Sequence, residues 1–382
     1  MCIINLNKKI ETINELLVDV IGKASKISTK NPNQPILENI LLELIDESTL
    51  KITSYNLDIF YTQDIFIKTK ETGKIKKICV NPHLLLSYLN LFDKGENVIL
   101  EILENTIKIK IKNQESNIQT VSSATYPNTS NFNIEKNDNG LTINSDVLID
   151  GIQSVSFAAA ISSIKPELSC VLMSYEDEVF NFVATDGFRL VEKKKVINKD
   201  SVKNIEDFKQ ILISAKTLND LLKIMYPNIT VSVFLEKGLF CIKTSDSLLC
   251  VRTVSGLYPN YKAILPSVFV TQIEMNTDDI TSALKVSNIF SDDFNYVKID
   301  IHDIDMDFYS KNSKIGESFS KKEIVKKGES ITQNYNHKYL SDFINKVKSE
   351  KITIEISGKT TPTLIKPLGD NSYVYMVMPM NK

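Results

Sequence analysis

The stretch NPHLLLSYLNLFDKGENVILEILENTIKIKIKN, residues 81–113, has two counterparts further along the chain. They are SAKTLNDLLKIMYPNITVSVFLEKGLFCIKTSD at 214–246 and NHKYLSDFINKVKSEKITIEIS at 336–357. In each, apolar residues at positions i, i+3, i+4 and i+7 lie on one face of a helix. These residues are Leu85, Tyr88, Leu89 and Phe92, then Leu218, Leu221, Leu222 and Met225, then Leu340, Phe343, Ile344 and Val347. Leu218 follows Leu85 by 133 residues and Leu340 follows Leu218 by 122, which indicates three copies of a domain-sized unit.

A second helical pattern precedes each of these segments. It is marked by Ile13, Leu16, Leu17 and Val20, then by Leu148, Ile152 and Val155, then by Ile280, Ala283, Leu284 and Ser287. Alternating stretches such as ITVSV (229–233) and ITIEI (352–356) predict strands with one face on a core. Each copy therefore consists of helix, strands, helix and strands. This order predicts an α+β fold, with two helices covering one face of an antiparallel sheet.

The first two copies close on similar turns. TVSSATYPN at 120–128 and TVSGLYPN at 253–260 both end in Tyr-Pro-Asn. Proline fixes φ and asparagine accepts turn conformations, so this ending predicts an exit from a domain into a linker. We therefore expect three domains, at residues 1–133, 134–270 and 271–382.

Three such copies in tandem leave sheet edges open at both ends, and open edges invite pairing with another chain. A two-fold dimer that pairs the edge of the first copy with the edge of the third would close a ring of six units. A trimer, or edges covered in another way, would satisfy the same pattern.

The composition excludes several classes of protein. Hydrophobic residues make up 42% and charged residues 24%, as in ordinary globular proteins. The net charge of −2 is unlike that of proteins that hold nucleic acid by bulk positive charge, so a DNA-binding role needs lysines gathered on one surface. No apolar run reaches the roughly 18–20 residues of a membrane span. The opening residues lack a secretory-signal pattern, so we expect a cytoplasmic protein without a membrane partner.

Five scattered cysteines, Cys2, Cys79, Cys170, Cys241 and Cys250, contain no CxxC pair. This pattern predicts free thiols in a reducing compartment rather than a disulfide framework or a zinc site. Among the 45 basic residues only Arg189 and Arg252 are arginine. Either two arginines survive by chance, or both positions need the planar, bidentate guanidinium.

Four segments carry a family resemblance. ATDGFRL (184–190) is similar to the ATDGHRL signature of the bacterial DNA sliding clamps, the beta subunit of DNA polymerase III holoenzyme. NQPILENILLEL (33–44) resembles their LPIL-x-N-hydrophobic segment, and LYPNYKAILP (257–266) resembles FPDYRRVLP. YVYMVMPMNK (373–382) resembles YVVMPMRL. The four segments run through all three copies in the family's order.

The resemblance implies three tandem DNA-clamp domains and a head-to-tail homodimeric ring around double-stranded DNA. Such a ring is a non-catalytic processivity factor, loaded by a clamp loader, that tethers the replicative polymerase and repair proteins. It implies no cofactor and no metal. It also implies a cleft for short peptide motifs of these partners. Carried over residue by residue, the cleft would comprise Leu168, Thr185, Gly187, Arg189, Leu190, Pro259, Ile264, Pro362, Met376, Met378, Pro379 and Met380.

The composition of this cleft suits its implied role. A shallow groove of methionine, leucine and proline adapts to several partner peptides. Thr185 and Arg189 would supply the few polar contacts that fix a peptide's orientation. Two positions depart from the family: Phe188 stands where histidine is usual, and Ala263 stands where many members have arginine. We therefore expect a less polar groove than the family's usual one.

Lysines on the polar faces of the repeated helices are candidates for loose contacts with DNA phosphates. They are Lys23, Lys26, Lys216, Lys223, Lys338 and Lys346. For any single one of them, an ordinary solvated lysine is the alternative. Val286 and Ile289, on the helix that opens the third copy, are candidates for the dimer interface.

An enzyme is the rival class of function. The three histidines, His83, His302 and His337, have no metal-ligand spacing, and His83 and His337 are expected to have surface roles. The sequence contains no P-loop, GxGxxG or GxSxG motif. A second rival is an interaction scaffold that uses the same repeat without forming a ring.

The acid-rich stretch DIHDIDMDF (300–308) allows two interpretations. One is a metal site. Its period-two alternation favours the other, a strand with acids in water and Ile299, Ile301, Ile304 or Met306 pointing inward.

Overall fold

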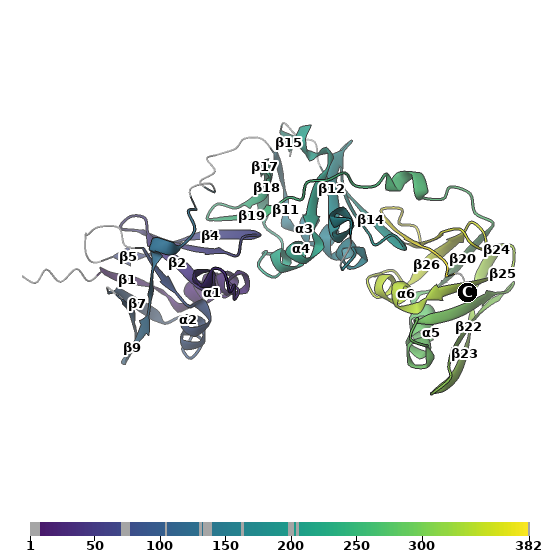
Figure 1. The fold of residues 1–382 in the computed structure, drawn as a ribbon, viewed down its shortest axis with the longest axis horizontal. Coiled ribbons are helices and arrows are strands. Elements are labelled where there is room, and N and C mark those ends of the chain that lie inside the picture. Colours follow the sequence, from purple (N-terminus) through teal and green to yellow (C-terminus); the bar gives the residue numbers. More distant parts are fainter. Residues whose placement is uncertain are drawn as a thin grey trace, which may run out of the picture. The chain divides into compact units, whose positions relative to one another are not determined.

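A computed structural model describes residues 8–69, 77–103, 105–129, 132, 140–161, 164–197, 202–203 and 206–380. The chain forms two compact units, and Figure 1 labels their helices and strands. The first unit comprises Met1–Asp146, Asp200–Ile205 and Lys216–Thr253. The second comprises Val147–Lys199, Glu206–Ala215 and Val254–Lys382.

The first unit contains two antiparallel sheets. The smaller has the order β5 (Lys68–Thr69), β1 (Lys8–Ile13), β7 (Asn97–Ile102), β8 (Thr106–Ile111) and β9 (Gln114–Gln119). The larger has the order β10 (Val121–Ser122), β6 (Lys77–Val80), β2 (Ile40–Leu44), β3 (Thr49–Tyr55), β4 (Ile59–Phe66), β19 (Ser247–Arg252), β18 (Leu239–Lys243), β17 (Thr230–Glu236), β11 (Gly140–Asn144) and β15 (Val202–Lys203). Because β4 pairs with β19, strands from the first and second copies of the repeat form one sheet.

Helix α1 (Asn14–Ile27) lies on this unit's strands and packs against α2 (Pro82–Leu89). Its apolar face, which includes Leu17 and Val20, is buried as the periodicity predicts. Asn14 joins the two helices, because its side-chain amide donates to the backbone oxygens of Leu89 at 3.1 Å and Phe92 at 3.2 Å. The Leu89 carbonyl ends α2 and the Phe92 carbonyl follows it, and carbonyls at the end of a helix lack helical partners.

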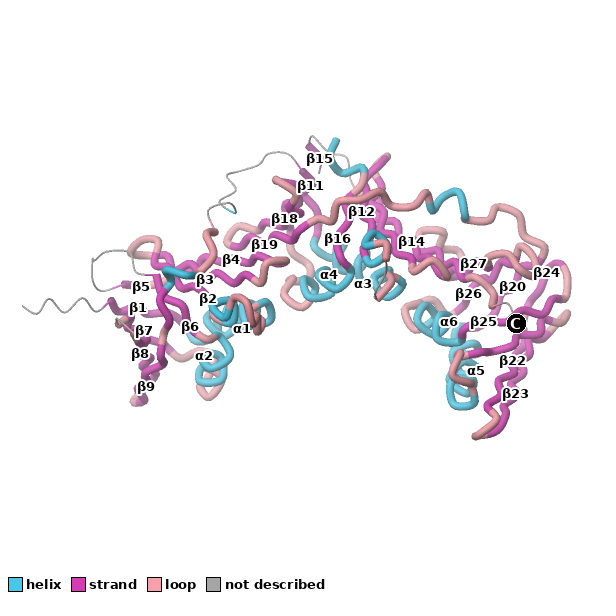
Figure 2. The backbone as a smooth tube through the Cα atoms, in the orientation of Figure 1, coloured by secondary structure: helices cyan, strands magenta, loops and turns pink. Residues whose placement is uncertain are grey.

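The second unit repeats the plan. Its larger sheet has the order β16 (Ile211–Ser214), β12 (Cys170–Glu176), β13 (Val179–Thr185), β14 (Arg189–Val196), β28 (Tyr373–Val377), β27 (Thr363–Pro367), β26 (Lys351–Ile356), β20 (Thr271–Asn276) and β24 (Val325–Gly328). Its smaller sheet has the order β23 (Gly316–Glu323), β22 (Asp305–Asn312), β21 (Tyr296–Ile301) and β25 (Ile331–Asn336). Figure 2 shows α5 (Thr277–Phe290) beside α6 (His337–Ile344), and the two helices are in contact. The β14–β28 pair joins strands of the second and third copies of the repeat, as the β4–β19 pair joins strands of the first and second copies.

The remaining helices are α3 (Ser145–Val155) and α4 (Ala215–Leu222). Helices α2, α4 and α6 each have eight residues. The last apolar position of each predicted face, at Phe92, Met225 and Val347, therefore lies beyond the helix end. Ile13 was expected on the buried face of α1, but it is the last residue of β1 and is exposed. Within the described part of the chain, no helix is long and apolar enough to cross a membrane.

The acid-rich stretch at 300–308 is a hairpin rather than a continuous strand. β21 ends at Ile301 and β22 begins at Asp305. Ile299, Ile301 and Met306 are buried, as the alternation predicts. Ile304 is 74% exposed, because it lies in the turn, where the period of two does not apply.

The prediction of a surface role for His337 is wrong. Its side chain is 1% exposed at the start of α6, and its Nε2 lies 3.0 Å from Ser291 Oγ. The neighbouring Asn336 caps the helix by accepting from the backbone N–H of Lys338. His83, at the corresponding start of α2, is exposed as expected.

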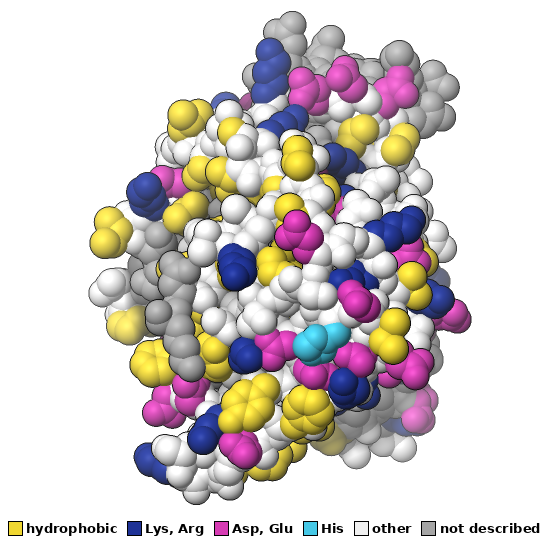
Figure 3. All heavy atoms as spheres, turned by 90° about the vertical axis from the view of Figure 1, so that its right-hand side faces the viewer, with side chains coloured by type: hydrophobic (Ala, Val, Ile, Leu, Met, Phe, Trp, Pro, Cys, Tyr) yellow, Lys and Arg dark blue, Asp and Glu magenta, His cyan; other side chains and the backbone are white. Residues whose placement is uncertain are grey.

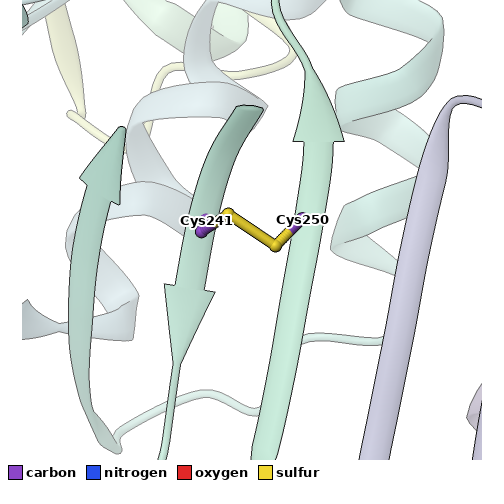
Figure 4. The surroundings of a disulfide bond; sticks show 2 residues. All are labelled: Cys241 and Cys250. Carbon is purple, nitrogen blue, oxygen red and sulfur yellow. A yellow bond between two sulfur atoms is a disulfide. The ribbon is translucent and has the colours of Figure 1, made fainter. Parts of the chain in front are cut away.

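The prediction of free cysteines fails at one pair. Cys241 on β18 and Cys250 on β19 face each other in the strand register and form a disulfide (Figure 4). The antiparallel register places the two Cα atoms 4.2 Å apart. The spacing of the cysteines along the sequence did not indicate this pair, because it does not reveal which residues face each other across two strands. Cys79 and Cys170 are buried free thiols, and burial raises the pKa of the Cys79 thiol to about 12. Cys2 lies outside the described residues.

Candidate functional site

The turn between β13 and β14 is the centre of the predicted cleft, and its own side chains hold its shape. Asp186 Oδ1 accepts from the backbone N–H groups of Phe188 at 2.9 Å and Arg189 at 3.0 Å. Thr185 Oγ1 accepts from the backbone N–H of Gly187 at 3.1 Å and donates to the backbone oxygen of Arg189 at 2.6 Å. Gly187 has a φ of 92°, which glycine adopts without a steric cost. The sequence TDG is thus suited to this turn.

Arg189 holds this turn against two other segments. Its Nε donates to Asp186 Oδ2 at 3.0 Å and its Nη1 to Asp342 Oδ2 at 2.6 Å. Its Nη2 donates to the backbone oxygen of Phe157 at 2.9 Å. The guanidinium carbon also lies 4.3 Å from the ring centroid of Tyr339. A planar, multidentate cation fits these directions together, and a lysine does not.

These contacts correct the roles expected of two polar residues. Thr185 and Arg189 were expected to orient a bound peptide, but they are only 6% and 8% exposed. Their polar atoms bond within the protein, so both residues shape the surface rather than form part of it. Asp342, Phe157 and Tyr339 were not anticipated, because no motif in the sequence marks them as partners of Arg189.

Two apolar residues of the predicted cleft belong to the core. Leu190 and Met376 face each other across the β14–β28 pair and are almost completely buried. They pack in one cluster with Tyr258 and Tyr261 of the linker that follows β19. Tyr261 also donates to Glu192 Oε1 at 2.8 Å, which fastens that linker to β14.

The remaining predicted residues reach the surface around this core. Leu168 in the 3-10 helix η5 (Pro166–Ser169) and Pro362 before β27 are half-buried. Gly187, Pro259 and Ile264 are exposed, and Met378, Pro379 and Met380 are half-buried. The backbone N–H of Met378 donates to the oxygen of Phe188 at 2.9 Å, so the carboxyl-terminal segment lies beside the turn. We call these residues, with Phe188, the peptide surface: Leu168, Gly187, Phe188, Pro259, Ile264, Pro362, Met378, Pro379 and Met380.

The two departures from the family pattern are both exposed. Phe188 presents an aromatic ring that is 64% exposed, and Ala263 is exposed beside Ile264. At these two positions, therefore, the protein exposes apolar groups.

The candidate DNA-facing lysines differ in their availability. Lys216, Lys338 and Lys346 are exposed. Lys26 donates to the backbone oxygen of Lys223 at 2.8 Å, and Lys223 also pairs with Asp220 at 2.6 Å.

The prediction that Lys23 lies on an open polar face is wrong. Its side chain is 9% exposed, pairs with Asp19 at 2.9 Å and lies 2.7 Å from the ring centroid of Tyr226. Burial lowers the pKa of Lys23, although Asp19 opposes this shift. In this position its ammonium group is not available to a phosphate.

The acid-rich stretch at 300–308, for which a metal site was the alternative interpretation, does bring three possible ligands together on the β21–β22 hairpin. Ligand atoms of His302, Asp305 and Asp307 lie within 4.8 Å of one another. Lys321 pairs with both carboxylates, at 3.1 and 3.5 Å. His302 Nε2 lies 3.2 Å from Asp307. The acids therefore already have cationic and polar partners.

Comparison with known proteins assigns the family. The chain matches the three domains of the DNA polymerase III beta subunit in series: the N-terminal domain at residues 9–130, the central domain at 142–260 and the C-terminal domain at 262–381. The chain belongs to the DNA polymerase III beta-subunit family. This sliding clamp is therefore a non-catalytic processivity subunit that serves DNA replication, built from three clamp domains.

Individual relatives match along almost their whole length. The beta sliding clamp of Buchnera aphidicola subsp. Rhopalosiphum padi is 26% identical over 368 residues, covering 96% of this clamp and 97% of the relative. That of Streptococcus pneumoniae is 25% identical over 369 residues, covering 93% and 94%.

Two solved structures show the same fold. The beta subunit of Thermotoga maritima has a TM-score of 0.85 at 23% identity, covering 98% of this clamp and 100% of that chain. The sliding clamp of Pseudomonas aeruginosa, solved bound to griselimycin, has a TM-score of 0.89 at 17% identity, with the same coverage.

Proposed function

We propose that the peptide surface binds short peptide segments of this clamp's partners, namely the replicative polymerase, the clamp loader and repair proteins. The observation that carries the proposal is the turn at 185–189. Arg189 and Asp186 lock this turn from within, and the rigid turn presents Phe188 beside Met378. A preformed apolar surface of this kind lowers the entropic cost of binding a flexible peptide.

The chemistry of the surface indicates what it selects. Its methionine and proline side chains are half-buried, and Ile264 and Phe188 are exposed. Methionine adapts to different apolar shapes, which suits several partners. Because Thr185 and Arg189 are committed to internal contacts, affinity rests on apolar anchors. Binding should therefore depend only weakly on salt.

Affinity for the isolated replicative polymerase tests this proposal. Met378→Ala and Phe188→Ala should each weaken binding about tenfold, the loss expected when roughly 1.4 kcal/mol of apolar contact is removed. Val196→Ala is the matched control, since Val196 is an exposed apolar residue at the far end of β14. Unchanged affinity in both surface variants would refute the assignment of this surface.

For the ring, we infer a head-to-tail dimer that pairs β9 of one protomer with β23 of its partner. Each is the outermost strand of its sheet. Helix α5 packs against β23 and exposes Val286 by 36% and Ile289 by 60%. Phe319 on β23 is 62% exposed. Figure 3 views this end of the second unit, where hydrophobic side chains gather toward the lower part among charged ones. Exposed apolar groups beside an unpaired edge are typical of an interface.

Within such a ring, Lys216, Lys338 and Lys346 remain candidates for loose contacts with phosphates. Contacts of this kind are independent of sequence and allow sliding. A polymerase held by the ring stays at a high effective concentration beside the primer end, which gives processivity. We place this activity in the cytoplasm, where bacterial chromosomal DNA is replicated.

Solution mass and retention on DNA test the ring. The wild-type chain should have the mass of a dimer, and Ile289→Asp should shift it toward the monomer. After loading with a clamp loader, the wild type should stay on closed plasmid and leave plasmid that has been cut once. A wild-type monomer at micromolar concentration, or equal retention on cut plasmid, would contradict the ring.

A further inference from the structure

The first unit contains a cavity of about 1090 Å³. It lies between the segment before β2 (residues 33–39), the β3–β4 turn, the segment after β10, the β17–β18 turn and the end of β19. Its lining includes Tyr55, Leu57, Phe132, Leu239, Lys237 and Arg252. All six belong to the first unit, so this cavity is separate from the peptide surface, which belongs to the second unit.

The cavity is built on the same kind of turn as the peptide surface. Asn56 Oδ1 accepts from the backbone N–H groups of Asp58 at 3.1 Å and Ile59 at 2.7 Å. Asp186 holds the β13–β14 turn with the same pair of bonds. Leu57 has a φ of 79° at the position that Gly187 takes in the second unit.

Strand pairing extends this correspondence. Phe60 pairs with Cys250 across β4–β19, as Leu190 pairs with Met376 across β14–β28. Two residues after Cys250, the backbone N–H of Arg252 donates to the oxygen of Asp58 at 3.1 Å. Met378, two residues after Met376, donates to Phe188 in the same way. Arg252 therefore takes the place of Met378.

The linker that follows each sheet corresponds as well. Tyr126 and Tyr258 are both buried and are each followed by proline, Pro127 and Pro259. Phe132 lies six residues after Tyr126, as Ile264 lies six residues after Tyr258. Pro127 and Phe132 line the cavity, where their counterparts belong to the peptide surface.

The walls of the cavity offer an apolar, aromatic seat. Phe132 stacks on Phe60 with 4.0 Å between ring centroids and meets Tyr55 edge-on at 5.4 Å. Leu57, Leu239 and Phe132 are partly buried against the core cluster of this unit. A seat of this kind fits one or two large apolar side chains of an extended peptide.

The charge of this cavity distinguishes it from the peptide surface. Its charged lining residues are Lys237 and Arg252, both cationic. Arg252 Nε donates to the backbone oxygen of Leu57 at 2.7 Å, and its Nη2 donates to Tyr55 Oη at 3.3 Å. Both acceptors are neutral, and no carboxylate among the described residues forms an ion pair with Arg252. The guanidinium is thus oriented but not neutralised, as in sites that recognise carboxylates.

We propose that this cavity is a second peptide-binding site, which takes an extended peptide with an apolar side chain next to a carboxylate. The cavity, its aromatic seat and its two cations support this independently of the peptide surface. The functional argument from the correspondence between the two sites rests on the proposed function of that surface. The only two arginines of the chain, Arg189 and Arg252, then each serve one site: Arg189 holds a turn, and Arg252 holds a turn and also meets the ligand.

A pair of peptides tests the proposal on the full chain. The probes are fluorescein-Gly-Leu-Phe-Asp and fluorescein-Gly-Leu-Phe-Asn, both amidated at the carboxyl end, and fluorescence anisotropy gives the dissociation constants. The aspartate peptide should bind at least about tenfold tighter than the asparagine peptide, the usual gain from a charge-assisted hydrogen bond. Arg252→Met, which installs the residue type of Met378, should abolish this preference. Phe132→Ala should weaken both peptides.

Further variants separate the possible outcomes. Lys237 is 74% exposed and pairs with Glu236 at 3.9 Å, so Lys237→Gln should reduce the preference less than Arg252→Met does, without affecting folding. Met378→Ala should leave it unchanged, because that residue lies in the other site. The proposal fails if the wild type shows no preference, or if Arg252→Met retains it while folding normally by circular dichroism. It also fails if only Met378→Ala abolishes binding, a result that would place the probe on the peptide surface.

Discussion

Arg189 and Asp342 form an ion pair 2.6 Å long between residues 153 positions apart in the sequence. This pair ties the β13–β14 turn to helix α6. Because Arg189 is 8% exposed, removing one partner leaves a charge without compensation in a poorly solvated place, where the cost is greatest.

Arg189→Lys should therefore destabilise the clamp by about 2 kcal/mol, since a lysine cannot reach Asp186, Asp342 and the Phe157 oxygen together. The change in unfolding free energy is measured by urea titration, from the transition that belongs to the second unit. Lys338→Arg is the control. It makes the reverse exchange between lysine and arginine at an exposed position on α6, the helix that carries Asp342. Equal stability of Arg189→Lys and wild type would show that a single point charge is sufficient here.

Gly151 permits close packing of α3 on β13. A Cβ at this position would lie 2.4 Å from the ring of Phe182, which is completely buried. Gly151→Ala should cost about 1–3 kcal/mol through overpacking, despite the better helix propensity of alanine.

Gly95→Ala provides the comparison for that variant, since a Cβ at Gly95 meets no atom within 4 Å. The midpoint of thermal unfolding of Gly95→Ala should be close to that of the wild type. A Gly151→Ala variant as stable as wild type would mean that Phe182 can shift.

His337 should make stability depend on pH. Burial, aided by the positive charge of Lys338, lowers its pKa in the folded chain. The unfolded chain then binds the proton more readily than the folded one. Stability is therefore fully present above the ordinary histidine pKa of about 6.5 and is lost as the pH falls below that value.

Urea unfolding between about pH 5 and pH 8 measures this effect. The decline in unfolding free energy below about pH 6.5 should be shallower in His337→Asn, which has no group titrating there. His83→Asn, a change at an exposed histidine, should keep the wild-type profile. Identical profiles for wild type and His337→Asn would rule out this histidine as the source.

The Cys241–Cys250 disulfide is tested by counting thiols. Of the five cysteines, Cys241 and Cys250 form the disulfide and Cys79 and Cys170 are free thiols. We expect Cys2, which lies outside the described residues, to be free as well. Ellman titration of the denatured, unreduced chain should therefore find three. Cys241→Ser should give four, because it releases Cys250 and removes only its partner. Five thiols in the wild type would show that the pair is reduced in solution.

The repeat was predictable because it rests on local patterns. Leu85, Leu218 and Leu340 lie at equivalent positions of short helices, and all three are buried. Helix length was not predictable from apolar spacing alone, since Phe92 continues the pattern after α2 has ended. The domain boundaries near residues 133 and 270 stay predictions, and residue 133 lies outside the described residues.

The site was only partly predictable. The ATDGFRL motif located the candidate cleft but was not used to predict a turn, although its Asp and Gly suit the turn that the structure shows. Burial decided which residues reach a partner, and this reversed the roles of Thr185, Arg189, Leu190 and Met376. Lys23 and His337 were misplaced for the same reason, since a polar side chain near a helix gives no local sign that another segment will cover it.

By itself, the sequence determined the three-fold repeat, the α+β class and the family resemblance, because each depends on neighbours within a few residues or on a motif. Only the tertiary structure decided the partners of Arg189, the burial of Lys23 and the facing of Cys241 and Cys250. It also decided that Arg252 lines a cavity corresponding to the peptide surface. Those features depend on strand register and on contacts between distant segments, which local pattern does not encode.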